Sequence, residues 1–226
     1  MNETIIISLG GSLIVPDSID IEFLKDFKSL ILSEVARGKR FVIITGGGKV
    51  ARRYIDAAKE LTEPSDEDLD FIGIASLRLN AELLRVIFGK HAYSKVISNL
   101  SEDLSFKEPV IIGSAYEPGH STDWDAVLAA KNKNAKKIIN LSNIDYVYDS
   151  DPSKNLNAQK IEKISWKEYK KIIPGSWTSG LNSPFDPTAS GEAESEGIEV
   201  VIMNGKPLSN LKNYLTGKSF KGTVIK

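Results

Sequence analysis

The chain lacks cysteine altogether and contains only two histidines and two methionines among its 226 residues. Without cysteine, disulfides, thiolate zinc sites and cysteine nucleophiles are all excluded. His91 and His120 are too few for a multi-histidine metal site, so we expect no metal ion held by protein ligands alone. The apolar runs are short, whereas a membrane-spanning helix needs about 20 apolar residues. The sequence therefore predicts no membrane-spanning segment.

Neither positive nor negative charge is in excess. The chain has 29 lysines and arginines and 30 aspartates and glutamates, which gives a formal net charge of −1. A chain without a basic excess does not present the broad positive face that binds nucleic acid. The first residues enter a strand-like run, without the basic and then long apolar segments of a secretory leader. We therefore expect a cytoplasmic protein with no nucleic-acid partner.

Short runs rich in β-branched residues alternate with longer segments of helical period. Strands are predicted at Thr4–Leu9, Arg40–Thr45, 94–97, 109–112, 136–141 and 200–203. Helices are predicted at 20–37, with Gly38 as a left-handed cap, from residue 49 onward, at 71–88 and at 123–133. This alternation predicts an α/β fold with a largely parallel sheet covered on both faces. Ligands of such sheets bind outside the carboxyl ends of the strands.

The first predicted strand ends at Gly10, Gly11 and Ser12. Glycines allow a backbone to approach a phosphate closely, and the N–H groups of such a loop form an anion-binding concavity. A Gly-Gly pair after a strand also occurs as a simple tight turn. By itself this motif leaves both interpretations open.

The second predicted strand ends at Gly46, Gly47 and Gly48, and a helix with Lys49 and Arg52 in its first turns follows. The helix N-terminus offers N–H donors and a positive dipole end to an anion. The cations themselves favour a bound anion there, although solvated helix cations are the alternative. The spacing fits neither the P-loop nor the dinucleotide-binding glycine pattern.

A third motif, PGHSTD, joins a predicted strand to a predicted helix. Ser121 or Thr122 is suited to cap that helix or to bind the phosphate or base of an acceptor. Asp123 and Asp125 place carboxylates near any phosphate, where Mg²⁺ would offset the repulsion. His120 is not favoured as a general base, because phosphoryl transfer to an ionised phosphate depends on positioning and charge neutralisation.

The fourth motif, NIDYVYDSDP, directly follows the strand predicted at 136–141. Tyr148 and Asp151 at a strand end would hold a nucleotide base against an aromatic face. The alternative is a surface loop built from Asx turns, which Asp and Pro favour in any case.

Taken in order, these motifs resemble the amino-acid kinase family, and most closely its archaeal-type UMP kinases. The resembling stretches are ISLGGSL, GGGKVARRYID, DFIGIASLRLNA, PGHSTD, NLSNIDYVYDSDP, FDP and KGTVI. The resemblance implies one three-layer α/β/α domain over residues 1–226, with acceptor binding in the N-terminal part and ATP binding from about residue 136. It also implies transfer of the ATP γ-phosphoryl to UMP, with Mg²⁺ as cofactor, by a homo-oligomer, either a hexamer or a dimer.

The resemblance also implies roles for individual residues. The predicted catalytic residues, at the transferring phosphates, are Gly10, Gly11, Ser12, Arg52 and Lys49, of which Lys49 would take the place of a family lysine. ATP would be bound by Gly10, Gly11, Gly47, Arg52, Ser142, Asn143, Tyr148 and Asp151. The acceptor would be bound by Gly46, Asp70, Ser114, Gly119, His120, Ser121 and Thr122.

The chain departs from the family pattern at several positions. Ser8 stands where many members carry a lysine, and Gly191 stands where archaeal UMP kinases carry another. Trp124 and Asp125 replace small apolar residues, and Tyr146 replaces a glycine. The stretch SGEAESEG, where the family has a helix, carries two glycines and no apolar stripe. Two alternatives follow, namely a family member with another small acceptor, or a nucleotide- or anion-binding oligomer that has lost its catalytic cations.

Overall fold

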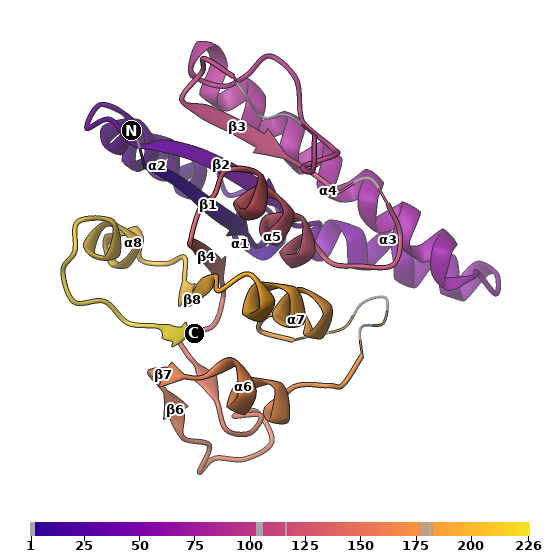
Figure 1. Ribbon diagram of the computed structural model, residues 1–226. Coiled ribbons are helices and arrows are strands. Elements are labelled where there is room, and N and C mark those ends of the chain that lie inside the picture. Colours follow the sequence, from indigo (N-terminus) through magenta and orange to yellow (C-terminus); the bar gives the residue numbers. More distant parts are fainter. Residues whose placement is uncertain (1–2, 103–105, 116, 177, 179–180, 182) are drawn as a thin grey trace.

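The computed structural model describes residues 3–102, 106–115, 117–176, 178, 181 and 183–226 (Figure 1). The strands are β1 (Thr4–Leu9), β2 (Arg40–Thr45), β3 (Val110–Gly113), β4 (Lys137–Ser142), β5 (Val147–Tyr148), β6 (Lys160–Ile161), β7 (Lys163–Ile164), β8 (Glu199–Asn204) and β9 (Thr223–Ile225). The helices are α1 (Gly11–Ile14), α2 (Ile21–Val35), α3 (Gly48–Leu61), α4 (Asp66–Phe88), the 3₁₀ turn η1 (Gly89–His91), α5 (Thr122–Asn132), α6 (Trp166–Ile172), α7 (Pro187–Ser195) and α8 (Leu208–Leu215).

Seven strands form the main sheet in the order β3-β2-β1-β4-β8-β9-β7, and β5 pairs with β6 in a separate ribbon. The strands from β3 to β8 in that order pair in parallel, whereas β9 runs antiparallel to β8. All five of these strands therefore direct their carboxyl ends to the same edge. The predicted strands at β1 and β2 are confirmed to the residue, and those at β3, β4 and β8 to within one or two residues.

Helices cover both faces of the sheet, which confirms the predicted three-layer fold. In β1, Ile5 and Ile7 belong to one buried cluster and Ile6 to the other, because successive side chains of a strand point to opposite faces. The first cluster contains buried residues of α2, α4 and α8, and the second contains those of α5, α6 and α7. Strands buried on both faces explain the apolar runs seen in the sequence.

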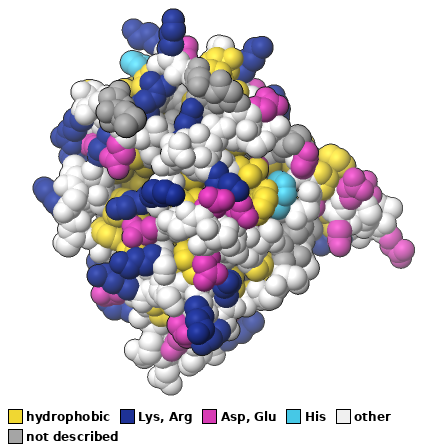
Figure 2. Space-filling view, in the orientation of Figure 1, with side chains coloured by type: hydrophobic (Ala, Val, Ile, Leu, Met, Phe, Trp, Pro, Cys, Tyr) yellow, Lys and Arg dark blue, Asp and Glu magenta, His cyan; other side chains and the backbone are white. Residues whose placement is uncertain are grey.

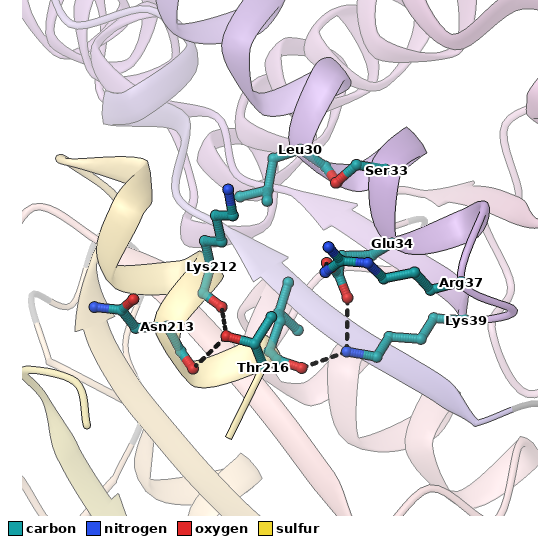
Figure 3. A network of polar contacts seen from close by, with 9 residues as sticks. Leu30, Ser33, Glu34, Arg37, Lys39, Lys212, Asn213 and Thr216 are labelled. Carbon is teal, nitrogen blue, oxygen red and sulfur yellow. Dashed lines mark hydrogen bonds and ion pairs between the residues drawn. The ribbon is translucent and has the colours of Figure 1, made fainter. Parts of the chain in front are cut away.

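The helix predicted at 20–37 is shorter by one residue at its start and two at its end, and Asp20 caps it by accepting a hydrogen bond from the Phe23 N–H. Gly38 has a φ of +90°, the left-handed conformation expected after a helix. The Glu34 side chain in the last turn of α2 is almost fully buried and pairs with Arg37 and with Lys39 at 2.8 Å. Lys39 also donates to the carbonyl of Leu215, so this network ties α2 to α8 (Figure 3).

Helices α3 and α4 pack against each other and project beyond the rest of the molecule (Figure 1). Every residue of α3 is at least partly exposed, and the projecting end carries apolar and acidic side chains (Figure 2). Helix α4 begins at Asp66, five residues before the predicted start, because Ser65 and Asp68 form a capping box.

One sequence prediction about secondary structure is wrong, and one departure from the family pattern does not prevent a helix. Residues 94–97 form no strand, since this described segment makes only an isolated bridge between Ile97 and Gly113. The stretch after Ala189 does form a helix, α7, because Asp186 caps it, Pro187 occupies its first position and small side chains pack beneath it. Of the helices in the described ranges, not one has both the length and the apolar character needed to cross a membrane.

Candidate functional site

The glycine loops that follow β1 and β2 contact each other through their backbones. A Cβ atom added to Gly11 would lie 2.2 Å from the nitrogen of Gly48 and 2.5 Å from the oxygen of Gly46. Gly48 has a φ of +63°, and a Cβ there would lie 2.4 Å from the carbonyl carbon of Gly11. Side chains at these two positions are therefore sterically excluded. The two predicted phosphate loops thus form a single backbone surface at one edge of the sheet.

Hydrogen bonds connect helix α4 to the second glycine loop and to the end of β2. The Asn80 side chain is 3% exposed and donates a hydrogen bond of 2.8 Å to the Gly46 carbonyl. Thr45, the last residue of β2, donates from its hydroxyl to the Leu77 carbonyl at 2.9 Å. Two polar side chains thus fix the end of β2 and the start of the glycine loop to the same helix.

A cavity of about 230 Å³ lies beside this loop. Its lining brings together residues predicted for phosphate and for acceptor binding, namely Gly47, Arg52, Asp70, His120, Ser121 and Thr122, and it also includes Gly48. Leu69, Ile74 and Leu77 of α4 add an apolar wall. A polar rim with a cationic group beside an apolar wall suits a ligand that has an anionic end and a flat, less polar body.

The cations of α3 have different surroundings. Arg52 is exposed at the cavity and forms no hydrogen bond or ion pair within the described part of the chain, so it is available to an anion. The Lys49 ammonium donates to Asp17 Oδ1 at 2.8 Å, and Arg53 lies 3.7 Å from the same oxygen. The hydrogen bond from Lys49 lowers the pKa of Asp17 below its ordinary value. Lys49, predicted as a catalytic cation, therefore has a carboxylate partner in this structure.

The PGHSTD segment is fastened to α4 by one hydrogen bond. The Gly119 N–H donates to Asp70 Oδ2 at 2.9 Å, and the φ of +97° at Gly119 favours glycine there. His120 is half-buried, and burial lowers its pKa while the nearby acids Glu117, Asp186 and Asp70 oppose that shift. Its Nδ1 is buried without a partner among the described residues. The lowered pKa favours the neutral form of His120, and its Nδ1 atom remains available for a hydrogen bond with a ligand.

A buried carboxylate lies beneath the ends of β1 and β4. Asp123 Oδ1 accepts hydrogen bonds from the Ser8 hydroxyl at 3.2 Å and from the Asn140 amide at 2.9 Å. Its Oδ2 accepts from the backbone N–H of Asp186 at 3.2 Å. Burial, and then the charge of Asp186, raises the pKa of Asp123 to about 7. Ser8, which stands where many family members carry a lysine, is therefore a neutral partner of this acid.

Two further acids lie close to Asp123. Asp125 is 1% exposed, its Oδ2 has no partner within the residues that the structure describes, and its pKa is raised well above the ordinary value by burial and then by Asp123. Asp186 is 3% exposed and accepts from the Ala189 N–H at 2.8 Å and from the Ser121 hydroxyl. This acidic region contains no lysine or arginine partner within the described contacts, which is unusual beside a phosphate site.

The other predicted site residues are distributed less compactly. Ser114 is fully buried with its hydroxyl 3.4 Å from that of Ser98, and it does not line the cavity. Ser142 adjoins Gly10, since a Cβ at Gly10 would lie 3.6 Å from the Ser142 Cα.

Asp151 forms an Asx turn with the N–H of Ser153, as the surface-loop interpretation expected. Asn143 is exposed at the end of β4, and Tyr148 is half-buried on β5. Tyr116, within the predicted acceptor loop, lies outside the described residues.

Sequence reasoning did not place Asn80 or Asp186 among the site residues, and it named Asp123 only as a carboxylate near the phosphates. Asn80 is a polar residue on the buried face of a long helix, and such a residue normally has a hydrogen-bond partner. Asp186 carries the signal of an Asp-Pro helix start, which predicts a cap rather than a site. Only the fold reveals that these three side chains support the loops around the cavity.

The fold and the site define the class of this protein, an α/β protein with two adjoining glycine loops and a cation at the carboxyl edge of a parallel sheet. Residues 3–204 match the amino acid kinase family, and the chain belongs to that family. The predicted membership is thereby confirmed.

Individual relatives are similar over their whole length. The chain is 37% identical over 229 residues to the uridylate kinase of Thermoplasma volcanium (100% of this chain, 98% of the relative) and 36% identical over 225 residues to that of Thermococcus onnurineus (98% of each). The solved structure of uridylate kinase from Archaeoglobus fulgidus has a TM-score of 0.81 at 35% identity, covering 99% of this chain and 100% of that one. UMP kinase from Ureaplasma parvum, at 23% identity and a TM-score of 0.81, supports the fold alone.

Proposed function

We propose that this protein is an ATP-dependent UMP kinase, which transfers the γ-phosphoryl group of ATP to UMP. The observation that carries the proposal is the cavity that is lined both by Arg52 and the Gly47 loop and by Asp70 and residues 120–122. The cation and the backbone N–H groups suit phosphate, while the polar side chains and the apolar wall suit a nucleoside. The relatives named uridylate kinase, similar over their full length, support the same substrate.

In the proposed reaction the acceptor phosphate lies at Arg52 and attacks the γ-phosphorus of ATP bound across the two glycine loops. The bond from the γ-phosphorus to the β,γ-bridging oxygen breaks as the new P–O bond forms, and ADP leaves. Because the attacking phosphate oxygen is already ionised, no general base is required. The residues of the chain align the two phosphates and offset their charge through Arg52 and backbone N–H groups.

The residues present fit a Mg²⁺ that arrives bound to ATP. Mg²⁺ in kinases is commonly held by substrate phosphates with one or two carboxylates or waters. Among the described residues, no cluster of three or more histidines and acids has the geometry to hold a metal. Both oxygens of Asp123 already accept hydrogen bonds from the protein, so the ion would depend on phosphates and water. Mg²⁺ would neutralise phosphate charge.

We propose that residues 1–226 act as one domain, with UMP bound by the N-terminal part and the ATP nucleoside bound from about residue 136. Ser142, beside Gly10, is a proposed ATP contact, together with Asn143, Tyr148 and Asp151. Tyr148 offers a half-buried ring to the base. The cytoplasm is the proposed location, because both nucleotides are cytoplasmic metabolites.

A homo-oligomer, either a hexamer or a dimer, is also proposed. Phe71, Leu79 and Val86 of α4 are 50%, 65% and 64% exposed, and their spacing places them along one side of the helix. Exposed apolar side chains aligned in this way favour association with another protein surface. Measurement of the solution mass, with and without Leu79→Asp, tests this part of the proposal.

The proposed activity is tested by a coupled assay with Mg-ATP against UMP, CMP, AMP and a set of acidic amino acids. Turnover with UMP above the other acceptors is the expected result. Turnover with a different acceptor would keep the phosphotransferase class and reject the substrate. Matched assays of Arg52→Ala separate enzyme activity from contamination, because loss of a phosphate-binding cation is expected to cost about 10²–10³ in rate.

A second candidate is a nucleotide-binding protein with weakened catalysis. It is favoured by Ser8, a neutral partner of Asp123, and by Gly191, which has no cationic side chain. Nucleotides would then raise the melting temperature of the protein without turnover. The same panel of nucleotides, measured by thermal unfolding, distinguishes this candidate from the kinase.

A further inference from the structure

The side chain of Asp186 connects the N-termini of two helices. It is the N-cap of α7, where Oδ1 accepts from the Ala189 N–H at 2.8 Å. Its other oxygen, Oδ2, accepts from the hydroxyl of Ser121, which is the N-cap of α5. The backbone N–H of Asp186 donates to Asp123 Oδ2 at 3.2 Å. One residue therefore fixes the start of α5 relative to the start of α7.

Asp186 is itself held rigidly through its neighbour in the chain. Phe185 is fully buried, with its ring centroid 6.1 Å from that of Trp166 on α6. The Tyr169 hydroxyl donates to the Phe185 carbonyl at 2.9 Å and accepts from the Phe185 N–H at 2.8 Å. Because both backbone groups of Phe185 are bonded to one buried side chain, Asp186 has little freedom to move away from Ser121.

Ser121 connects Asp186 to the cavity. It lines the cavity with His120 and Thr122, and its hydroxyl accepts from the Asp123 N–H at 3.0 Å while donating to Asp186. A hydroxyl has a single proton, so its donation to Asp186 fixes the direction in which the oxygen accepts. The orientation of the segment 119–122 thus depends on the acid at position 186.

The chemistry also explains why the residue is an aspartate. Capping α7 requires one acceptor oxygen, and binding the Ser121 hydroxyl requires a second. A carboxylate supplies two acceptor oxygens, whereas an asparagine supplies one oxygen and an amide that only donates. Asparagine would cap α7 equally well, but its amide can only donate to the Ser121 oxygen, so the Ser121 hydroxyl proton would lose its acceptor and the direction of the bond would reverse.

We propose that Asp186 is a positioning residue for the acceptor, which acts through Ser121 to hold the segment 119–122 in the conformation that binds the acceptor nucleotide. This inference rests on the proposed function, because the acceptor is taken to be UMP. Asp186 acts on the shape of the acceptor site and makes no contact with the transferred phosphoryl group.

The test compares Asp186→Asn with Ser190→Ala. The first variant keeps the α7 cap and removes only the acceptor for Ser121. The second removes the bond from the Ser190 hydroxyl to the Asp186 carbonyl, 2.6 Å long, at the same helix end without altering the carboxylate. Asp186→Asn is expected to raise the KM for UMP about tenfold, with kcat changed less than threefold. Ser190→Ala is expected to lower the melting temperature and leave the KM for UMP unchanged.

A double-mutant cycle with Ser121→Ala then tests whether Asp186 acts through Ser121. If it does, the double variant has a KM no higher than that of the more affected single variant. Additive increases, or an unchanged KM in Asp186→Asn, would overturn the inference while the kinase activity of the wild type stands. If Asp186→Asn does not fold, Ser121→Ala against Ser190→Ala makes the same comparison.

A wild type without turnover would reject the proposed function instead. The double-mutant cycle is then measured through the increase in melting temperature that UMP produces. The effects of the two substitutions on this increase are again expected to be non-additive. If UMP produces no increase in the wild type, the inference falls together with the proposed function.

Discussion

The Lys49 ammonium lies 2.8 Å from Oδ1 of Asp17, a residue of the loop between α1 and α2. Lys49 belongs to the first turn of α3, beside the two glycine loops, where an anion is favoured by the helix N-terminus. Asp17 thus provides a carboxylate at the place where the phosphates of ATP are expected. The pair is largely exposed, so a phosphate is able to displace the carboxylate at small cost.

Substitution at these two positions is expected to have opposite effects on ATP. Lys49→Ala removes a cation from the phosphate site and is expected to lower kcat/KM for ATP about 10²-fold. Asp17→Asn removes the competing carboxylate and is expected to lower the KM for ATP by about two- to fivefold. Steady-state kinetics at low ionic strength measure both. An equal loss of activity in the two variants would show that the pair is needed intact.

Gly191 offers a position at which to restore a cation. Gly191 is exposed, and a Cβ added there would meet no described atom within 4 Å beyond the nearby backbone of its own helix, so a side chain can begin at this position. Gly191→Lys is expected to raise kcat with UMP about tenfold or more, because this position carries a lysine in the archaeal UMP kinases that the chain resembles. Gly191→Ala is the matched control, with about 0.5–1 kcal/mol of added stability from the helix interior and unchanged kcat.

Loss of Glu34 is expected to destabilise the fold without affecting the site. Glu34→Ala leaves the mostly buried Lys39 with only the Leu215 carbonyl as acceptor and is expected to cost about 1–3 kcal/mol of unfolding free energy. Urea denaturation measures this change. Glu22→Ala is the control, because the Glu22 side chain is 79% exposed and its pair with Lys25 contributes little. A similar small effect for both variants would contradict the importance of the α2–α8 network.

Stability is expected to fall as the pH rises from about 4 to about 7. The pKa of Asp123 is raised from 3.8 to about 7 in the folded state, so the folded protein binds more protons than the unfolded chain in this window. The free energy of unfolding then decreases by roughly 1.4 kcal/mol per pH unit for each such group. Asp125, whose pKa is raised in the same direction by burial, adds to this slope.

The variant Asp125→Asn isolates one part of this effect. Asparagine keeps the shape of the side chain but does not ionise, so the dependence on pH is expected to become shallower, with no loss of stability at pH about 8. Asp151→Asn is the control, since Asp151 is exposed and its pKa is lowered by its hydrogen bonds with Ser153. Denaturant titrations at several pH values measure the slopes. A wild-type stability that rises with pH across the window would contradict the assignment of buried, neutral acids.

The sequence alone determined the elements whose signal is local. The runs Thr4–Leu9 and Arg40–Thr45 specify β1 and β2 because β-branched residues favour strands and the flanking glycines end them. The helical period located α2, although its N-cap Asp20 was counted as part of the predicted helix, and the S-x-x-D pattern at Ser65 was available for the start of α4. The order of the motifs, read along the chain, was also sufficient to indicate the family.

Tertiary structure alone decided what depends on groups far apart in the chain. Gly11 and Gly48 are required as glycines by the contact between their loops, which no local pattern reveals. The bond between Ser121 and Asp186 joins residues 65 positions apart, and that between Ser8 and Asp123 spans 115. Such contacts follow from the packing of helices on a sheet, and that packing sets both the burial of the acids and the support of the acceptor segment.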